Sequence, residues 1–551
     1  MHARHTLGRL ALGSFFILVP ISACSSSGAP SASVDGGQDG STAGEVSLSA
    51  LSVATSSGKS LALSPSFSGD IHDYYVRCAA GTNALQVSMT ASPGATSALT
   101  EPTPSPAKAS QRVSVSVDEN AAIVATASGT VKGASSSVAY WVRCLPPDFP
   151  AVALTTFPTA GDPAPGYYLI GNATVSVGEG GYAMVVDVHG VPVWYHPVTA
   201  DLAVTDVETL IPGKISFITT SFAAYEPFEI QTLSPLAHQT IAPDGATTDE
   251  HELRVLANGH YLVFSYPPVS NVDLTGVAIT KGFDAGVVEL GPNSTIQDCE
   301  LVEFDASGKV AWEWSASAHF DPAKVSTYPQ TSFGPSVVPD GGKAYDVFHC
   351  NSVDEDPANG NLLVSARGTD SVFYIEKSSG KVLWKMGGTK SSKDPETVFV
   401  SVTDPFFRQH DARLLPGWEP TCHGGTGQIS MFDDETAEPG PARGVVYDVV
   451  VGGGTGDGCG DAGAGASPGE AKVTWQYAGN ATSGGAGSVR STSTGGRVVG
   501  WGIGTPILTE VGQNGEKLVE LAFPSGDISY RAVKVPSSAF DLDVLRMTAG
   551  K

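Results

Sequence analysis

Charge is scarce in this chain of 551 residues, and most of it has one sign. Only 16% of the residues are charged, and 56 Asp and Glu against 31 Lys and Arg give a formal net charge of −25. Such a balance repels nucleic-acid phosphates, so we expect no nucleic-acid partner. The chain also lacks a zinc-type Cys/His cluster and a phosphate-binding loop of the form G-x-x-x-x-G-K-[ST].

Long apolar runs are missing except at the start. Leu10–Ile21 follows Arg4 and Arg9 and is too short to span a bilayer, so residues 1–23 are typical of a secretory signal peptide. Ser22-Ala23-Cys24 resembles the lipobox of bacterial lipoproteins. The resemblance implies cleavage before Cys24 and lipid on its thiol and new amino terminus; the alternative is cleavage nearby that leaves Cys24 free.

Residues 24–45 are rich in Ser, Gly and Asp without apolar periodicity, which predicts a flexible tether. We therefore expect an exported protein of the bacterial cell envelope. It would lie at the outer membrane's periplasmic face or at the cell surface, and touch the membrane only through its lipid.

Cysteine is also sparse, with seven in all, and six remain without Cys24. An even number in an exported protein favours disulfides, although six cysteines allow 15 pairings. The matching segments "DYYVRC" and "AYWVRC" end in Cys78 and Cys144, which predicts the pair Cys78–Cys144. The two other predicted pairs are Cys299–Cys350 and Cys422–Cys459. Cys299–Cys350 would brace the loop at His349, and Cys422–Cys459 would close a Gly-rich insertion.

What the chain does have is 64 Gly and 37 Pro between short apolar runs, which predicts an all-β protein. Segments such as "QRVSVSVDEN" and "AAIVATAS" alternate in polarity within residues 46–146, which indicates a small β-sandwich. The run "LALSPSFSGDIHDYYVRCAAGTNALQVSMTA" resembles the cadherin-like modules of bacterial surface proteins, which are usually spacers or adhesive modules.

From about residue 166 to the end of the predicted domain 150–551, one hairpin pattern recurs, in which a strand and a Gly turn precede a Trp-bearing strand. The clearest copies are "YAMVVDVHGVPVWYHPV", "CELVEFDASGKVAWEWSAS" and "DSVFYIEKSSGKVLWKMGG". About six copies, some degenerate, favour a six-bladed β-propeller. The alternative is a pair of unrelated sandwiches.

A second repeated element lies between the hairpins, and each copy opens on a polar residue. The opening residues are Asp206, His251, His349, His410 and Ser488. Repeat positions in a propeller are related by rotation about its axis, so we expect these side chains to ring one end of the channel.

Three converging histidines could bind a metal, supply a nucleophile and proton carriers, or be hydrogen-bonded core residues. Nearby arginines favour the second choice, because fixed cations disfavour a metal dication and favour an oxyanion. Arg367 ends the strand after His349, and Arg408 lies two residues before His410. If both lie in one strand, Arg408 and His410 share a face and Asp411 points away.

Together "HELRVLANGHYLVF", "HCNSVDEDPANGNLLVSAR" and "RQHDARLLPG" resemble the arylsulfate sulfotransferase family over about residues 150–551. The family implies transfer of a sulfuryl group from a phenolic sulfate to a phenol, without the nucleotide sulfate donor, a metal or an organic cofactor. By position, His410 corresponds to the nucleophile. The sulfate-binding and proton-transferring groups correspond to His251, His349 and Arg367. Asn351 is a weaker correspondence, and the alternative is that it only fixes its loop. Arg408 is expected to contact substrate because of its place beside His410.

Two features depart from the simplest family pattern: the insertion at 451–470 and the sandwich in front. Two other functions stay open at this point. One is a non-catalytic surface propeller that binds a ligand, and the other is a metal-dependent lyase or hydrolase in the same channel.

Overall fold

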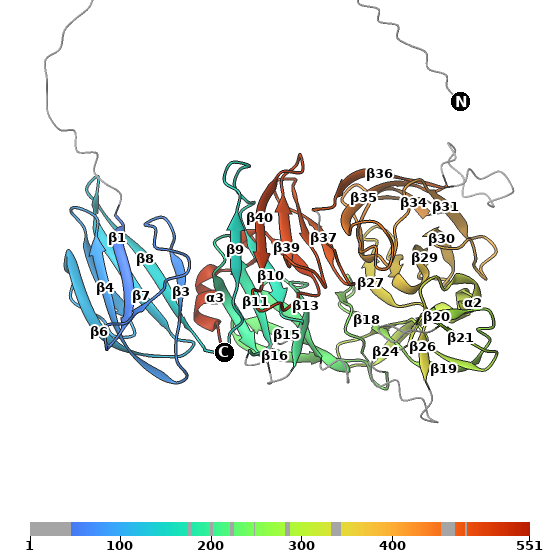
Figure 1. Ribbon diagram of the computed structural model, residues 1–551, viewed down its shortest axis with the longest axis horizontal. Coiled ribbons are helices and arrows are strands. Elements are labelled where there is room, and N and C mark those ends of the chain that lie inside the picture. The colour runs from blue at the N-terminus through green and yellow to red at the C-terminus, as the bar shows by residue number, and fades with distance from the viewer. Residues whose placement is uncertain are drawn as a thin grey trace, which may run out of the picture. The chain divides into compact units, whose positions relative to one another are not determined.

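The structure is a computed structural model (Figure 1). It describes residues 46–173, 179–198, 202–220, 225–246, 248–280, 287–331, 343–421, 424–452, 469–479 and 482–551. The signal peptide, the tether with Cys24, and the predicted pair Cys422–Cys459 lie outside the described residues. None of the helices in the described ranges has the length and apolarity needed to cross a membrane.

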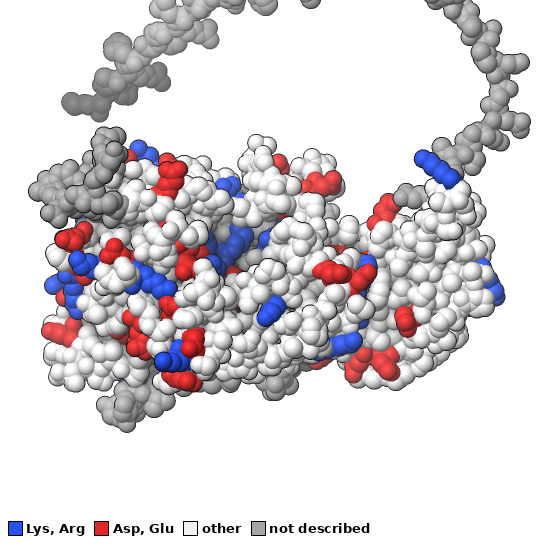
Figure 2. Space-filling view, turned by 180° about the vertical axis from the view of Figure 1, so that it is seen from behind, with Lys and Arg blue, Asp and Glu red and all other residues white. Residues whose placement is uncertain are grey.

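The described chain is all-β apart from five short helical segments. These are α1 Ala316–His319, α2 Pro322–Val325, α3 Leu542–Thr548 and the 3₁₀ turns η1 Arg367–Thr369 and η2 Ser537–Ala539. Charge is sparse on the face shown in Figure 2, where one group of Lys and Arg lies in a hollow.

The first part of the chain forms two four-stranded sheets. One has the order β2–β1–β4–β6, from β1 Leu48–Thr55, β2 Ser60–Leu61, β4 Thr82–Ala91 and β6 Ser110–Asp118. The other has the order β3–β8–β7–β5, from β3 Asp73–Arg77, β5 Thr96–Glu101, β7 Ala122–Val131 and β8 Ala134–Leu145. Alternate residues of β4 (Leu85, Val87, Met89) are buried in a common core, as the alternating polarity predicts.

The predicted disulfide Cys78–Cys144 is present, with its Cα atoms 5.5 Å apart. It lies where β3 and β8 run parallel, since Val76 of β3 is the register partner of Cys144.

Within the described residues, the remaining chain contains six units of four hydrogen-bonded strands. Strands are given in pairing order. The first unit is β41 Ala532–Val535, β10 Tyr167–Gly171, β11 Tyr182–Asp187 and β12 Pro192–Pro197. The second is β13 Ala203–Glu208, β14 Lys214–Thr220, β15 Tyr225–Leu233 and β16 Leu236–Ile241, and the third is β17 Leu253–Val255, β18 Tyr261–Ser265, β23 Glu300–Phe304 and β24 Val310–Ser315.

The other three units lie further along the chain. The fourth unit is β27 Cys350–Glu355, β28 Leu362–Ala366, β29 Ser371–Ile375 and β30 Val382–Gly387. The fifth is β32 His410–Leu414, β34 Gly424–Asp433, β35 Arg443–Val450 and β36 Glu470–Tyr477, and the sixth is β37 Ser488–Ser491, β38 Arg497–Gly500, β39 Leu508–Val511 and β40 Lys517–Ala522.

Shorter strands extend or connect these units. They are β9 Ala153–Thr156 beside β40, β31 Val398–Val402 between β30 and β36, β33 Glu419–Thr421 beside β34, and two small sheets from β19 Pro268–Val272, β20 Ala278–Thr280, β21 Val287–Glu289, β22 Ser294–Gln297, β25 Gln330–Thr331 and β26 Ala344–Asp346.

The predicted hairpins recur as the third and fourth strands of each unit. The three clearest copies form β11–β12, β23–β24 and β29–β30, and two degenerate ones form β15–β16 and β39–β40. In the β11–β12 turn, Asp187 accepts hydrogen bonds from the amides of His189 and Val191, and Gly190 adopts φ 80. A left-handed residue at this point favours glycine, which explains the Gly turn.

The last strand among the described residues completes the first unit, because β41 pairs with β10. The C-terminal helix α3 also contacts the N-terminal sheets. Arg546 forms two hydrogen bonds to the carboxylate of Asp73, at 2.9 and 2.7 Å.

Candidate active site

A pocket of about 290 Å³ brings together the three repeat histidines and one arginine. His251 lies just before β17, His349 just before β27, and His410 opens β32, so each belongs to the start of the first strand of its unit. The ring centroids of His251 and His349 are 5.0 Å apart, and those of His349 and His410 are 6.4 Å apart. Other walls of the pocket are Tyr266, Tyr530, Ile503, Ile528 and the segment Gly484–Ala486.

The hydrogen bonds of His410 define its tautomer. Its Nδ1 lies 3.0 Å from the backbone oxygen of Arg408 and 3.1 Å from Oδ2 of Asp434, so Nδ1 faces two acceptors and carries the proton. Its Nε2 accepts a hydrogen bond from the backbone N–H of Ala486 at 3.2 Å, so Nε2 carries the lone pair.

Burial lowers the pKa of His410 to about 4, because the opposing effect of the Asp434 carboxylate is smaller and Arg367 lowers it further. The imidazole is therefore neutral at pH 7, and its unprotonated Nε2 faces the backbone N–H of Ala486, a residue of the pocket wall.

His251 and His349 have carboxylate partners of their own. Nδ1 of His251 lies 2.5 Å from Asp249, and Nδ1 of His349 lies 2.5 Å from Asp346. Burial acts to lower the pKa of His251, but the charge of Asp249 and its hydrogen bond outweigh burial and raise that pKa. The pocket thus holds one histidine that is neutral and another that is biased toward the protonated form, an arrangement typical of acid–base pairs.

Arg367 is the cation of this pocket. It follows β28, and its backbone N–H donates to the backbone oxygen of His349 at 2.8 Å. Its guanidinium donates through Nη1 to Gln330 at 2.9 Å, and its Nε lies 3.7 Å from Asp434. No hydrogen-bond partner is found for Nη2 among the described residues, and a Cβ at Gly485 would lie 3.7 Å from it. This group can therefore bind an oxyanion.

The expectation that Arg408 shares a strand face with His410 is wrong. The strand begins at His410, and Arg408 precedes it with φ 55. The guanidinium of Arg408 lies outside the pocket lining, pairs with Glu438 at 2.8 Å and stacks on Tyr328 at 4.4 Å. Because Arg367 contacts the same ring at 5.0 Å, Arg408 supports Arg367 through Tyr328.

Asn351 is fully buried and does not line the pocket. Its side-chain amide donates to the backbone oxygen of Gln409 at 2.8 Å, which fixes the residue before His410.

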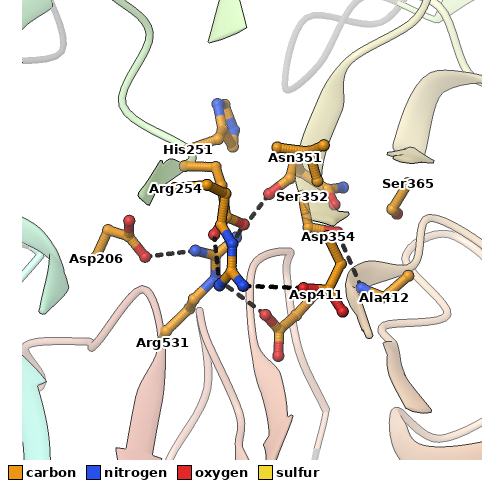
Figure 3. A network of polar contacts seen from close by, with 12 residues as sticks. Asp206, His251, Arg254, Asn351, Ser352, Asp354, Ser365, Asp411, Ala412 and Arg531 are labelled. Carbon is orange, nitrogen blue, oxygen red and sulfur yellow. Dashed lines mark hydrogen bonds and ion pairs between the residues drawn. The ribbon is translucent and has the colours of Figure 1, made fainter. Parts of the chain in front are cut away.

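Behind the histidines lies a buried network of ion pairs, shown in Figure 3. Arg531 reaches between Asp206 and Asp411, pairs with both, and pairs through Nη2 with Glu252 at 2.9 Å. Burial acts to lower the pKa of Arg531, but Asp206 and Glu252 raise it well above its usual range. Arg413 also belongs to this network, at 2.6 Å from Glu252.

Two of the five residues predicted to ring the channel, Asp206 and Ser488, do not line the pocket. Asp206 turns toward Arg531 instead of the pocket because it lies within β13 at a register shift, and Thr205 lines the pocket in its place. Ser488 bonds to the backbone of Ala532, and Ala486 lines the pocket in its place.

The predicted disulfide Cys299–Cys350 is present, with its Cα atoms 5.9 Å apart, and Cys350 directly follows His349.

Sequence reasoning missed three carboxylates, Asp249, Asp346 and Asp434. The first two stand two and three residues before their histidines, which is a local signal. Asp434 lies 24 residues after His410 (434 − 410), and the sequence carries no local pattern for it.

Residues 232–454 match the arylsulfotransferase (ASST) family model. The match supports the arylsulfotransferase family, and with it a sulfotransferase activity in general. It includes His251, His349, Arg367 and His410, but ends before Ala486 and Tyr530.

No curated protein matches the chain. One similar crystal structure is a candidate 6-phosphogluconolactonase from Bacteroides fragilis, with 10% identity, TM-score 0.28, and coverage of 80% of this chain and 98% of that one. Another is a quinonprotein alcohol dehydrogenase-like protein from Bacteroides thetaiotaomicron, with 12% identity, TM-score 0.12, and coverage of 58% and 94%. These likenesses are too low to carry an argument.

In the part of the chain that the structure describes, no group of three or more His, Cys, Asp or Glu side chains is arranged to hold a metal ion.

Replacing Arg531 should destabilise the fold. Arg531→Ala leaves Asp206 buried without its paired cation and removes one of the two close cations of Glu252. We therefore expect the free energy of unfolding to fall by about 3–5 kcal/mol. Urea unfolding followed by intrinsic fluorescence measures this change. Lys59→Ala, at an exposed position, is the control and should change nothing. A loss below about 1 kcal/mol in Arg531→Ala would mean that the network is not a major source of stability.

Proposed function

We propose that this protein transfers a sulfuryl group from a phenolic sulfate ester to a phenol, through a sulfated His410, without the nucleotide sulfate donor. The single observation that carries the proposal is the convergence of three histidines and Arg367 on one pocket, where the unprotonated Nε2 of His410 accepts only a backbone hydrogen bond from the pocket-lining Ala486 among the described residues. The match of residues 232–454 to the arylsulfotransferase family supports the same chemistry.

In the first half-reaction, Nε2 of His410 attacks sulfur, the Nε2–S bond forms and the bond from sulfur to the aryl oxygen breaks. The leaving phenolate takes its proton from His251, the histidine whose pKa is raised. Nη2 of Arg367 binds sulfuryl oxygens and stabilises their charge. The approach of sulfur breaks the hydrogen bond from the Ala486 amide to Nε2, and that N–H becomes available to a sulfuryl oxygen.

In the second half-reaction, an acceptor phenol gives its proton to His251 and its oxygen attacks sulfur. The Nε2–S bond breaks, and neutral His410 is regenerated. The two steps balance, and no metal or organic cofactor takes part in them. The covalent intermediate divides one difficult transfer into two easier ones.

The ion network gives a reason for this order of events. Arg531, Glu252 and Asp411 are buried side by side behind the histidines, so they close the space on that side. Donor and acceptor would then use the same entrance in turn, as in ping-pong kinetics.

We further propose that the six four-stranded units form a six-bladed propeller, with β41, β13, β17, β27, β32 and β37 innermost. The network supports this arrangement, because its members come from five of these strands and meet. Asp206, Asn351 and Asp411 lie within β13, β27 and β32, and Arg531 and Glu252 stand immediately before β41 and β17. Strand β41 would close the ring by joining the last segment to the first blade.

A colorimetric assay with p-nitrophenyl sulfate, with and without phenol and a chelator, tests the function. We expect continuous turnover to p-nitrophenol that requires phenol, resists the chelator and gives parallel double-reciprocal lines. Without phenol, release should stop after a single burst. Release without phenol that the chelator abolishes would indicate a metal-dependent hydrolase. Binding without turnover would indicate a non-catalytic module.

Variants locate the nucleophile. His410→Ala should lower turnover by several orders of magnitude, and Arg367→Ala by about 10²- to 10³-fold. Mass spectrometry after mixing with donor alone should show one added SO₃ on the wild type and none on His410→Ala. His319→Ala is the matched control, since His319 pairs with Asp394 at 2.9 Å outside the pocket. Near-normal activity of His410→Ala, or added mass on His251 or His349, would refute the assignment.

The pH profile follows from the two histidines. The first half-reaction needs neutral His410 and protonated His251, so kcat/KM for the donor should fall on the acid side near the pKa of His410, about 4. It should fall on the alkaline side above the ordinary histidine pKa of about 6.5, because the pKa of His251 is raised.

The groups that act on these pKa values are Asp434, Arg367 and His349 at His410, and Asp249, Glu250 and Arg531 at His251. Asp249→Asn should move the alkaline limb to lower pH. An alkaline limb that this change leaves in place, or an acid limb near 6.5, would contradict the roles.

Export and anchoring are proposed from the leader alone. We propose that the mature chain starts at a lipidated Cys24, with a tether to residue 45, a cadherin-like sandwich over 46–146 and the sulfotransferase region over 150–551. Wild-type protein should then sediment with membranes, and Cys24→Ser should be released. Sedimentation of both proteins would remove the lipid anchor from the proposal.

A further inference from the structure

Asp434 lies directly after β34, and its carboxylate is fully buried, with 0% exposure of the side chain. Its Oδ1 accepts a hydrogen bond from the backbone N–H of Thr436 at 2.9 Å, which holds the carboxylate in one orientation. Its Oδ2 then lies 3.1 Å from Nδ1 of His410 and 3.7 Å from Nε of Arg367. One oxygen atom therefore faces both the proposed nucleophile and the proposed oxyanion-binding cation.

Asp434 acts on His410 through the charge that it places beside the imidazole ring. Nδ1 of His410 already has an acceptor in the Arg408 backbone oxygen at 3.0 Å, so Asp434 is not needed to complete its hydrogen bonding. What Asp434 adds is a negative charge beside the imidazole. That charge has most effect when the ring becomes positive, which happens when Nε2 bonds to sulfur while Nδ1 keeps its proton.

Asp434 also acts on Arg367 in the pocket before any substrate is bound. The carboxylate partly balances the charge of Arg367, whose other contacts, Gln330 and Tyr328, are neutral. It therefore weakens the attraction of the empty pocket for an anion, while it favours the sulfated state of His410.

We infer that Asp434 is a positioning residue that stabilises the sulfated imidazolium of His410 and lowers the affinity of the unreacted pocket for sulfate. The inference rests on the proposed function. In the step concerned, Nε2–S forms, sulfur–aryl oxygen breaks, and the phenolate takes its proton from His251. The Nδ1 proton stays on His410, so no further reactant is required.

The test uses Asp434→Asn, which keeps the shape and removes the charge. The burst of p-nitrophenol from p-nitrophenyl sulfate without acceptor reports the first half-reaction, and a phenol chase reports the second. We expect the burst rate to fall about 10²- to 10³-fold. The chase should change less than about tenfold, since loss of the carboxylate makes imidazole a better leaving group.

Binding of inorganic sulfate, measured by calorimetry, gives a readout that needs no turnover. Sulfate should bind Asp434→Asn about three- to tenfold more tightly than the wild type, because a buried like charge is gone. Asp356→Asn is the matched control. Asp356 is buried and accepts hydrogen bonds from Tyr374 and Trp418 outside the pocket, so both readouts should stay at the wild-type values.

Three results would overturn the inference. They are a burst within about threefold of the wild type, a burst and chase that slow equally, and sulfate affinity that is unchanged or weaker. If the wild type gives no burst at all, the proposed function fails, and the sulfate measurement still decides whether Asp434 opposes anion binding.

Discussion

The candidate site depends on the contacts that the buried Arg531 side chain makes. Its guanidinium pairs with Glu252 and Asp411 and donates to the backbone oxygen of Asn351 at 2.7 Å. These three residues stand immediately after His251, immediately after His410 and two places after His349. A single buried cation therefore fixes the backbone beside each histidine. Ion pairs this deeply buried leave little freedom, because removing one partner leaves another charge uncompensated.

The three histidines share a structural position but not an environment. His410 is buried, has an unprotonated Nε2 at the pocket wall and has a low pKa, whereas the carboxylate beside His251 raises the pKa of that ring. The chemistry that we propose needs this difference, because one ring must attack while neutral and another must deliver a proton. Equivalent positions in a repeated fold thus acquire separate roles through the carboxylates around them.

The sequence predicts the parts of this arrangement that local patterns determine. Alternation and Gly turns identify the hairpins, and the repeat spacing places three histidines at equivalent positions, which the structure brings into one pocket. Side-chain direction was harder to predict. Arg408 and Arg413 flank His410 in sequence, yet they pair with Glu438 and Glu252, which lie on distant segments. Such pairings depend on how the units pack, and no local pattern specifies them.

The central claim is a double displacement at sulfur through His410. Each in-line displacement inverts the configuration of sulfur, so two of them retain it. The most direct measurement uses a phenolic sulfate made chiral at sulfur with three oxygen isotopes, and determines the configuration of the sulfated product. The account predicts retention with the wild-type protein. Inversion would show direct transfer from donor to acceptor and would contradict a sulfated histidine.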